Sequence, residues 1–214
     1  MQLEILPKKF RNLKQSRWVH IDLGLTKDSA GVACGHVERF VKVQRGENEY
    51  EIMPEIIFDF VLEVRSPKNG EIVFEKVRTL LYKLRGLKLP IKWISMDSYQ
   101  SKDVGQILRQ KNFKTGQVSI DKSTVPYDFT KSAFLDRRIL LPNHQRALDE
   151  IVHLERNQKS MKIDHPPSGS KDLSDAIAGV VYGLVCRREI WARHKVTSFV
   201  PSHVIAEIIS HNSE

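Results

Sequence analysis

Cysteine is scarce in this sequence, which has only Cys34 and Cys186 in 214 residues. Two cysteines this far apart form neither a disulfide framework nor a zinc-ligand motif, and they predict packed thiols in a reducing compartment. The sequence also lacks any apolar run of roughly 20 residues, which excludes a membrane-spanning helix. The amino-terminal stretch MQLEILPKKFRNLK lacks the apolar core of a signal peptide. We therefore expect a soluble, cytoplasmic protein with no membrane partner.

Acidic residues are in the minority, because Asp and Glu total 26 against 34 Lys and Arg, giving a formal net charge of +8. Hydrophobic residues make up 41% of the chain, which is enough to build a core, so disorder is not the default expectation. The cationic excess favours a polyanionic partner such as nucleic acid, since each phosphate that is neutralised releases condensed counterions. The alternative interpretation is that the charge serves solubility alone.

The hydrophobic pattern predicts an α/β protein. Alternating or apolar runs typical of strands come first, and helical periods then alternate with further strands. The expected strands are 18–23, 31–43, 52–62, 91–97, 118–120 and 139–141, with a hairpin at 155–164. The expected helices are 72–84, a short one from 101, 126–136, 143–154 and 173–186. This order is typical of a mixed β-sheet flanked by helices.

The chain shows no internal repeat, and its length suggests one domain with short appendages. Residues 1–16 are basic and loosely patterned, so we interpret them as a lead-in or linker. Residues 17–187 form the predicted domain, and residues 188–214 are a carboxy-terminal extension that is either a short helix or an ordered tail.

Four acids occupy unusual positions. Asp22 lies in an otherwise apolar strand, Asp97 ends another buried strand, and Asp172 and Asp175 lie in the first turn of an apolar helix. A carboxylate in apolar surroundings is costly unless it is paired, hydrogen-bonded or bound to a cation. Acids that converge from remote parts of the sequence repel one another, and Mg²⁺ is the usual counterion. Two such ions roughly 4 Å apart can drive phosphodiester hydrolysis, and Asp22 is the natural bridging ligand.

Each acid also has a purely structural interpretation. Asp22 can form the turn before Gly24, and Asp97 can close its strand or cap a helix. Asp172 can complement the dipole of its helix without any chemistry. Asp175 shares a helix face with Asp172, three residues earlier.

The surroundings of these acids resemble the nuclease motifs of phage terminase large subunits. The three matching stretches are HIDLGLTKDSAGVA at 20–33, ISMDSYQS at 94–101 and GSKDLSDAIAG at 169–179. Two further stretches, 121–127 and 137–142, are also similar to that family. The resemblance covers about residues 17–187 with the motifs in the family's order.

This resemblance implies a ribonuclease H-like fold, two Mg²⁺ or Mn²⁺ ions, and cleavage of double-stranded DNA during viral genome packaging in the host cytoplasm. It assigns catalysis and metal binding to Asp22, Asp97 and Asp172, and it makes Asp175 a further ligand or a neighbour of one. The implied partners are an ATPase motor domain, a portal and a small terminase subunit. The sequence has no GxxxxGK[ST] phosphate loop, so we expect an excised nuclease domain or a motor on a separate polypeptide.

Basic residues near the motifs are candidates for DNA-backbone contacts, which position a duplex without reading its sequence. We expect this role for Lys27, Lys171, Arg137 and Arg138. His20 shares a strand face with Asp22 and can either touch a metal or substrate or be a satisfied polar neighbour. Two other functions stay open: a resolvase-like nuclease of the same fold, and a DNA-binding or docking module that is inactive alone.

Overall fold

The computed structural model describes residues 10–23, 29–65, 74–97, 101–158, 162–167, 169–196, 200–202 and 204. Its elements are β1 (Arg17–Asp22), β2 (Ser29–Gln44), β3 (Tyr50–Arg65), α1 (Phe74–Gly86), β4 (Ile91–Met96), α2 (Ser101–Gln110), β5 (Thr115–Gln117), α3 (Val125–Leu135), β6 (Ile139–Leu140), α4 (Gln145–Val152), β7 (Glu155–Arg156), β8 (Ile163–Asp164), α5 (Asp172–Cys186) and α6 (Arg188–Arg193). The elements appear in the order that the sequence predicts.

The described strands form a mixed six-stranded sheet in the order β5-β4-β1-β2-β3-β6, beside a small β7–β8 hairpin. Neighbours β1, β2 and β3 pair antiparallel, whereas β1–β4, β4–β5 and β3–β6 pair parallel. The prediction of an α/β mixed sheet is therefore confirmed. The strand predicted at 118–120 is wrong by a few residues, because β5 ends at Gln117 and the amide of Ile120 donates to the Asp97 carboxylate instead.

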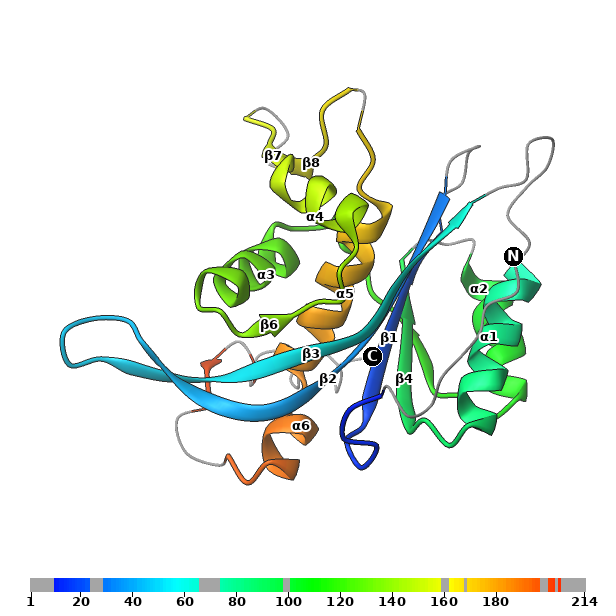
Figure 1. Cartoon of the computed structure of the whole chain (residues 1–214), viewed down its shortest axis with the longest axis horizontal. Coiled ribbons are helices and arrows are strands. Elements are labelled where there is room, and N and C mark those ends of the chain that lie inside the picture. Colours follow the sequence, from blue (N-terminus) through cyan, green and yellow to red (C-terminus); the bar gives the residue numbers. More distant parts are fainter. Residues whose placement is uncertain are drawn as a thin grey trace.

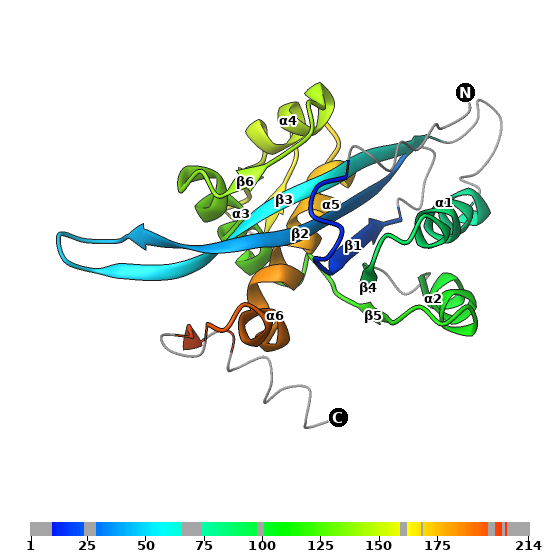
Figure 2. The ribbon, with the colours of Figure 1, turned by 60° about the horizontal axis from the view of Figure 1, so that its bottom comes forward.

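The alternation of side chains along β1 explains why the sheet has a core on each face. Trp18 faces the core built around α5, whereas Val19 and Ile21 face the core that contains α1 and α2. Figure 1 shows α1 and α2 on one side of the sheet and α3, α4 and α5 on the other. The rotated view in Figure 2 shows the same two layers and the long β2–β3 ribbon that extends beyond the rest of the sheet.

Helix α5 is buried around nearly its whole circumference. All its residues except Asp172 and Tyr182 are buried, as expected for a helix enclosed by the sheet and by neighbouring helices. It packs against β1, β2 and β3 on one side and against α3 and α4 on the other. No helix in the described part of the chain has the length and apolar character needed to cross a membrane.

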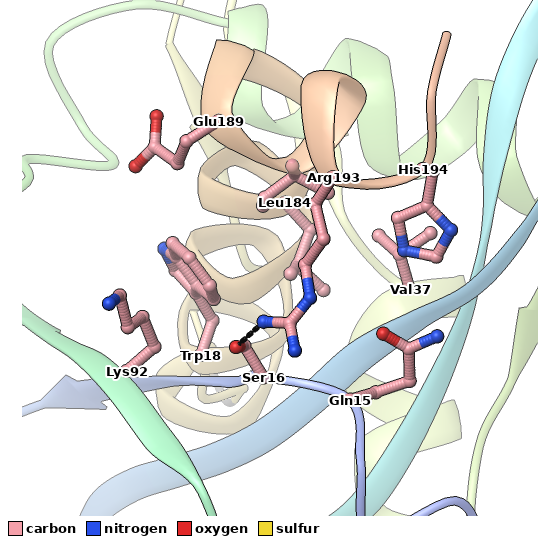
Figure 3. A pocket seen from close by; sticks show the side chains of 10 residues that line it. Gln15, Ser16, Trp18, Val37, Lys92, Leu184, Glu189, Arg193 and His194 are labelled. Atoms are coloured by element: carbon pink, nitrogen blue, oxygen red, sulfur yellow. Dashed lines mark hydrogen bonds between the residues drawn. The ribbon is translucent and has the colours of Figure 1, made fainter.

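The segments on either side of the predicted domain pack against it. Ile190 and Trp191 of α6 are buried in the core around α5, and the Trp191 indole N–H donates to the carbonyl of Val185 at 2.8 Å. Arg193 of α6 in turn contacts Ser16 of the lead-in (Figure 3). A cavity of about 220 Å³ lies at this junction, between residues 15–16, β1 and α6.

Candidate active site

The acids are brought together by a register between strand β1 and helix α5. Successive residues on one face of a strand lie about 6.7 Å apart, and every fourth residue of a helix is about 6 Å further along, so the two spacings match. Trp18 packs on Gly183, where an added Cβ would be 2.9 Å from the indole, and His20 packs on Gly179, where it would be 2.2 Å from the imidazole. The next pair in this series is Asp22 and Asp175.

Gly31 fixes the start of α5 beside the end of β1. It is the partner of Asp22 in the β1–β2 pairing, and an added Cβ there would lie 1.9 Å from the carbonyl oxygen of Asp172. Only a residue without a side chain allows the helix to approach this closely. The carboxylate of Asp172 accepts hydrogen bonds from the hydroxyl of Ser29 and from that of Ser170, the latter at 3.1 Å.

Asp97 reaches the same region from the neighbouring strand. It follows β4, which runs parallel to β1, and its backbone N–H donates to the carbonyl of Ile21 at 3.3 Å. Its carboxylate accepts the backbone N–H of Ile120 at 3.1 Å. Burial raises the pKa of Asp97. Asp97 therefore lies beside Asp22, as expected for residues at the carboxyl ends of adjacent parallel strands.

We call Asp22, Asp97, Asp172 and Asp175 the acid cluster. Burial, together with the negative charges of Asp175, Asp172 and Asp97, raises the pKa of Asp22 from 3.8 to about 8. Burial also raises the pKa of Asp175 to about 7, although the nearby Lys171 opposes this shift. The shift of Asp22 shows that the charges of the other three acids act on it, and a raised carboxyl pKa of this kind is typical of a functional site.

Two basic or polar side chains stabilise Asp175. The Tyr127 hydroxyl donates to one carboxylate oxygen, and the Lys171 ammonium lies 3.3 Å from the other. Lys171 also contacts Asp121, and these two acids raise the pKa of its ammonium against the opposing effect of burial. Lys171 therefore acts as a counterion within the site.

The acid cluster borders a cavity of about 1300 Å³. Its acidic lining residues are Asp22, Glu63, Asp121, Asp149, Glu150, Asp172 and Asp175, and its basic ones include Arg65, Arg146 and Lys171. Asp97 is not among the described residues that line the cavity, and its backbone N–H contacts the carbonyl of Ile21 in β1. The roles of Glu63, Glu150 and Tyr127 were not foreseen from the sequence, because each lies in a segment whose pattern is ordinary for a strand or an amphipathic helix.

The basic residues expected at DNA lie in different environments. Lys27 falls outside the described residues, and Lys171 lines the cavity. Arg137 is exposed, whereas Arg138 is buried, pairing with Asp136 at 3.1 Å and donating to the carbonyl of Pro54 at 2.8 Å. Among the described residues neither of these two arginines lines the cavity. Arg65 and Arg146 are the arginines that do.

His20 is a buried neighbour of the site rather than part of its surface. Its Nδ1 lies 2.8 Å from the hydroxyl of Ser95, and its Nε2 has no hydrogen-bond partner among the described residues. Burial lowers the pKa of His20 to about 3, so the ring is neutral. The ring packs directly on Gly179.

The donor chemistry of the acid cluster fits a hard divalent cation, since Mg²⁺ and Mn²⁺ prefer carboxylate oxygens. Within the described ranges, however, no three His, Cys, Asp or Glu side chains lie close enough together to hold a metal ion. Three of the four carboxylates contact donors of the protein instead. Asp172 accepts from serine hydroxyls, and Asp175 contacts Lys171 and Tyr127. Asp97 accepts from the backbone N–H of Ile120. For one ion to contact several of these carboxylates, they would have to approach one another more closely.

Gly31→Ala tests the close approach of β2 and α5. The new methyl group would meet backbone rather than a movable side chain, so we expect the free energy of unfolding to fall by about 2 kcal/mol. The displaced Asp172 should also reduce any cleavage activity at least about tenfold. Chemical denaturation gives the first quantity and a plasmid assay the second.

The matched control is Gly105→Ala in α2, where the nearest atom is the flexible Met96 Cε at 3.1 Å. Alanine favours helix there by up to about 1 kcal/mol, so this variant should be as stable as the parent or more so. Equal stability of the two variants would mean that Asp172 does not depend on the glycine.

Comparison with known proteins reveals similarity at the level of structure. No protein-family model matches the chain, and no curated protein matches it. The crystal structure of the large terminase nuclease from thermophilic phage G20c aligns with a TM-score of 0.57 and 11% identity, over 80% of this chain and 83% of that one. The same nuclease with bound magnesium aligns with a TM-score of 0.51 and 12% identity, over 78% and 80% of the two chains.

The large terminase of bacteriophage HK97 also aligns, with a TM-score of 0.54 and 9% identity. The match covers 79% of this chain but 39% of the HK97 protein, so this chain corresponds to a part of that longer polypeptide. At such low identities the likeness concerns the fold. The chain therefore has the ribonuclease H-like fold of phage large terminase nuclease domains, as its sequence motifs predicted.

Proposed function

We propose that this protein is a metal-dependent endonuclease that cleaves double-stranded DNA, as in viral genome packaging. One observation carries the proposal. A fold shared with terminase nucleases brings four acids, from β1, the end of β4 and the start of α5, into one region, where burial and the charges of the other three raise the pKa of Asp22 to about 8. A cluster of carboxylates that repel one another beside a large cavity is suited to divalent cations and to the phosphate group that they bind.

The residues of the acid cluster would hold two Mg²⁺ or Mn²⁺ ions, with Asp22 at the centre. When bound, such ions activate a water molecule and neutralise charge on the leaving oxygen of a phosphodiester. The chain's own contribution is to position the ligands. Hydrogen bonds restrict how three of these carboxylates turn. Ser29 donates its hydroxyl to Asp172, Ile120 donates its backbone N–H to Asp97, and Tyr127 donates its hydroxyl to Asp175.

DNA would approach through the cavity beside the acid cluster. Lys171 and the cavity arginines Arg65 and Arg146 are the described cations placed to meet phosphates there. Lys27 stays a proposed phosphate contact. The G20c large terminase nuclease has been crystallised with bound magnesium, and its likeness to this chain supports the choice of Mg²⁺ as a cofactor here. From the terminase-like motifs of the sequence we also propose an ATPase motor domain, a portal and a small terminase subunit as partners.

Cleavage of supercoiled plasmid in Mg²⁺, Mn²⁺ or EDTA tests the proposed function. The parent protein should nick and linearise the plasmid only with metal, and Asp97→Asn should abolish both products. Glu55→Gln is the control, because Glu55 pairs with Arg39 on the β2–β3 ribbon, well separated from the acid cluster along β3. Metal-independent cleavage, or cleavage that survives in Asp97→Asn, would contradict the assignment.

A DNA-binding module that does not cut alone is a second candidate. It is favoured by the finding that the described acids are not gathered tightly enough to hold an ion. In that case the same assay should give no products, while the affinity for DNA should fall steeply as salt is added. A resolvase-like nuclease would instead prefer branched DNA over the linear duplex.

A further inference from the structure

Helix α5 begins with a cap that another helix supplies. The N-cap residue Lys171 makes no side-chain capping hydrogen bond in the described structure. The carboxylate of Glu150 on α4 accepts the backbone N–H groups of Leu173 at 2.9 Å and of Ser174 at 3.1 Å, both through Oε2. The first amides of a helix have no partner within it, so Glu150 satisfies two donors that would otherwise be buried without an acceptor.

Glu150 is well placed for this task. It is only 7% exposed, and burial raises its pKa. The two amides and the positive end of the α5 dipole offset the cost of burying its charge. Arg146, one turn earlier on α4, lies 3.5 Å from the other carboxylate oxygen and also pairs with Glu63 of β3 at 2.5 Å. Glu150 is therefore held between α4, α5 and the sheet.

We propose that Glu150 is a positioning residue that fixes Asp172 and Asp175 against Asp22. Asp172 immediately precedes the first amide that Glu150 accepts, and Asp175 immediately follows the second. A shift of the first turn of α5 would move both carboxylates together. This inference rests on the proposed function, because it assigns Glu150 to the same reaction.

A charge effect is the competing explanation for any sensitivity at this position. Glu150 lies near enough to Asp172 for that charge to raise its pKa, so it can also influence the acid cluster electrostatically. Two conservative variants separate the explanations. Glu150→Gln removes the charge but keeps the length and an oxygen acceptor, whereas Glu150→Asp keeps the charge but shortens the side chain by one methylene.

Backbone hydrogen exchange on the metal-free full chain measures the capping directly, and it does not depend on nuclease activity. We expect the amides of Leu173 and Ser174 to exchange at least about tenfold faster in Glu150→Asp than in the parent, and at nearly the parent rate in Glu150→Gln. Calorimetric titration with MnCl₂ should show the same order, with weaker binding in the Asp variant. The kcat for plasmid cleavage should fall at least about tenfold in Glu150→Asp and by less than about threefold in Glu150→Gln.

Arg146→Gln is a further control for the exchange measurement alone, because it keeps the Glu150 carboxylate and should leave both amides protected. Parent-like exchange and kcat in Glu150→Asp would overturn the proposal, and so would a Gln variant that is as impaired as the Asp variant. If the parent itself fails to cleave DNA, the proposed function is wrong. The exchange and MnCl₂ measurements still decide whether Glu150 holds the acids in place.

Discussion

Asp22→Asn is expected to abolish DNA cleavage and, at the same time, to stabilise the metal-free protein. Asp22 is the centre of the acid cluster, and its charge is disfavoured by burial and by the charges of Asp175, Asp172 and Asp97. Asparagine has nearly the same shape but no charge, so it relieves this repulsion. It also provides a poor ligand for a hard cation. Activity and stability should therefore change in opposite directions, with cleavage falling by about three orders of magnitude or more.

The pH dependence of this stabilisation follows from the raised pKa. The folded state binds the Asp22 proton more tightly than the unfolded chain, because the pKa rises from 3.8 to about 8 on folding. The stability that this proton contributes is fully present below pH 4 and is lost as the pH rises through about 8. Each pKa unit corresponds to about 1.4 kcal/mol. At pH 8.5 we therefore expect the free energy of unfolding of Asp22→Asn to exceed that of the parent by at least about 2 kcal/mol. Near pH 4 the gain should vanish.

Calorimetric unfolding in EDTA at both pH values measures the effect. Glu155→Gln in the exposed strand β7 is the control for charge removal in general, and it should change stability by less than about 0.5 kcal/mol. Added Mg²⁺ should raise the unfolding temperature of the parent protein more than that of Asp22→Asn. A variant that is less stable than the parent at pH 8.5 would mean that Asp22 is stabilised in its ionised form by partners other than a cation.

Much of the fold could be predicted because the hydrophobic period is a local property. Apolar alternation located β1 and β3, and a helical period located α3 and α5, within a few residues of their bounds. Strand β5 was misplaced for a reason that is not local. Ile120 is buried like a strand residue, but its amide is used by Asp97, which lies 23 residues earlier in the chain.

The candidate site could be predicted only where a residue conflicted with its local surroundings. Each acid of the cluster is a carboxylate in an apolar strand or at the start of an apolar helix, and such residues stand out. Glu150 and Glu63 do not, because glutamates are ordinary in an amphipathic helix and near the end of a strand. Their importance depends on which elements the fold places beside them, and the Glu150 contact to α5 spans 23 or 24 residues.

Asp59 shows that the same signal also selects structural acids. It lies in the apolar stretch Ile56–Val61 of β3, as Asp22 lies in β1, yet it is not among the described residues that line the acid cluster's cavity, and it pairs with Arg17. The guanidinium donates to both oxygens of Asp59 at 3.1 Å, and Nδ1 of His36 lies 3.1 Å from one of them. The charge of Asp59 is thus balanced by Arg17, which lies 42 residues earlier in the chain, whereas a metal ion would balance the charge of a catalytic acid.

Asp59→Ala should therefore cost stability without loss of chemistry. Arg17 is 0% exposed, and removing Asp59 leaves its buried guanidinium with backbone carbonyl acceptors but without the paired carboxylate. Breaking a buried ion pair in this way typically destabilises a protein by roughly 3–5 kcal/mol, and we expect a loss of about 3 kcal/mol here. Glu55→Ala, which breaks the exposed pair with Arg39, should cost less than about 1 kcal/mol. Urea denaturation compares the two variants.

Below its unfolding temperature, Asp59→Ala should cleave plasmid at a rate within about threefold of the parent, because Asp59 touches neither the substrate cavity nor the acid cluster. A stable but inactive Asp59→Ala would instead place Asp59 in the catalytic machinery, and the distinction between paired and metal-binding acids drawn from these contacts would fail.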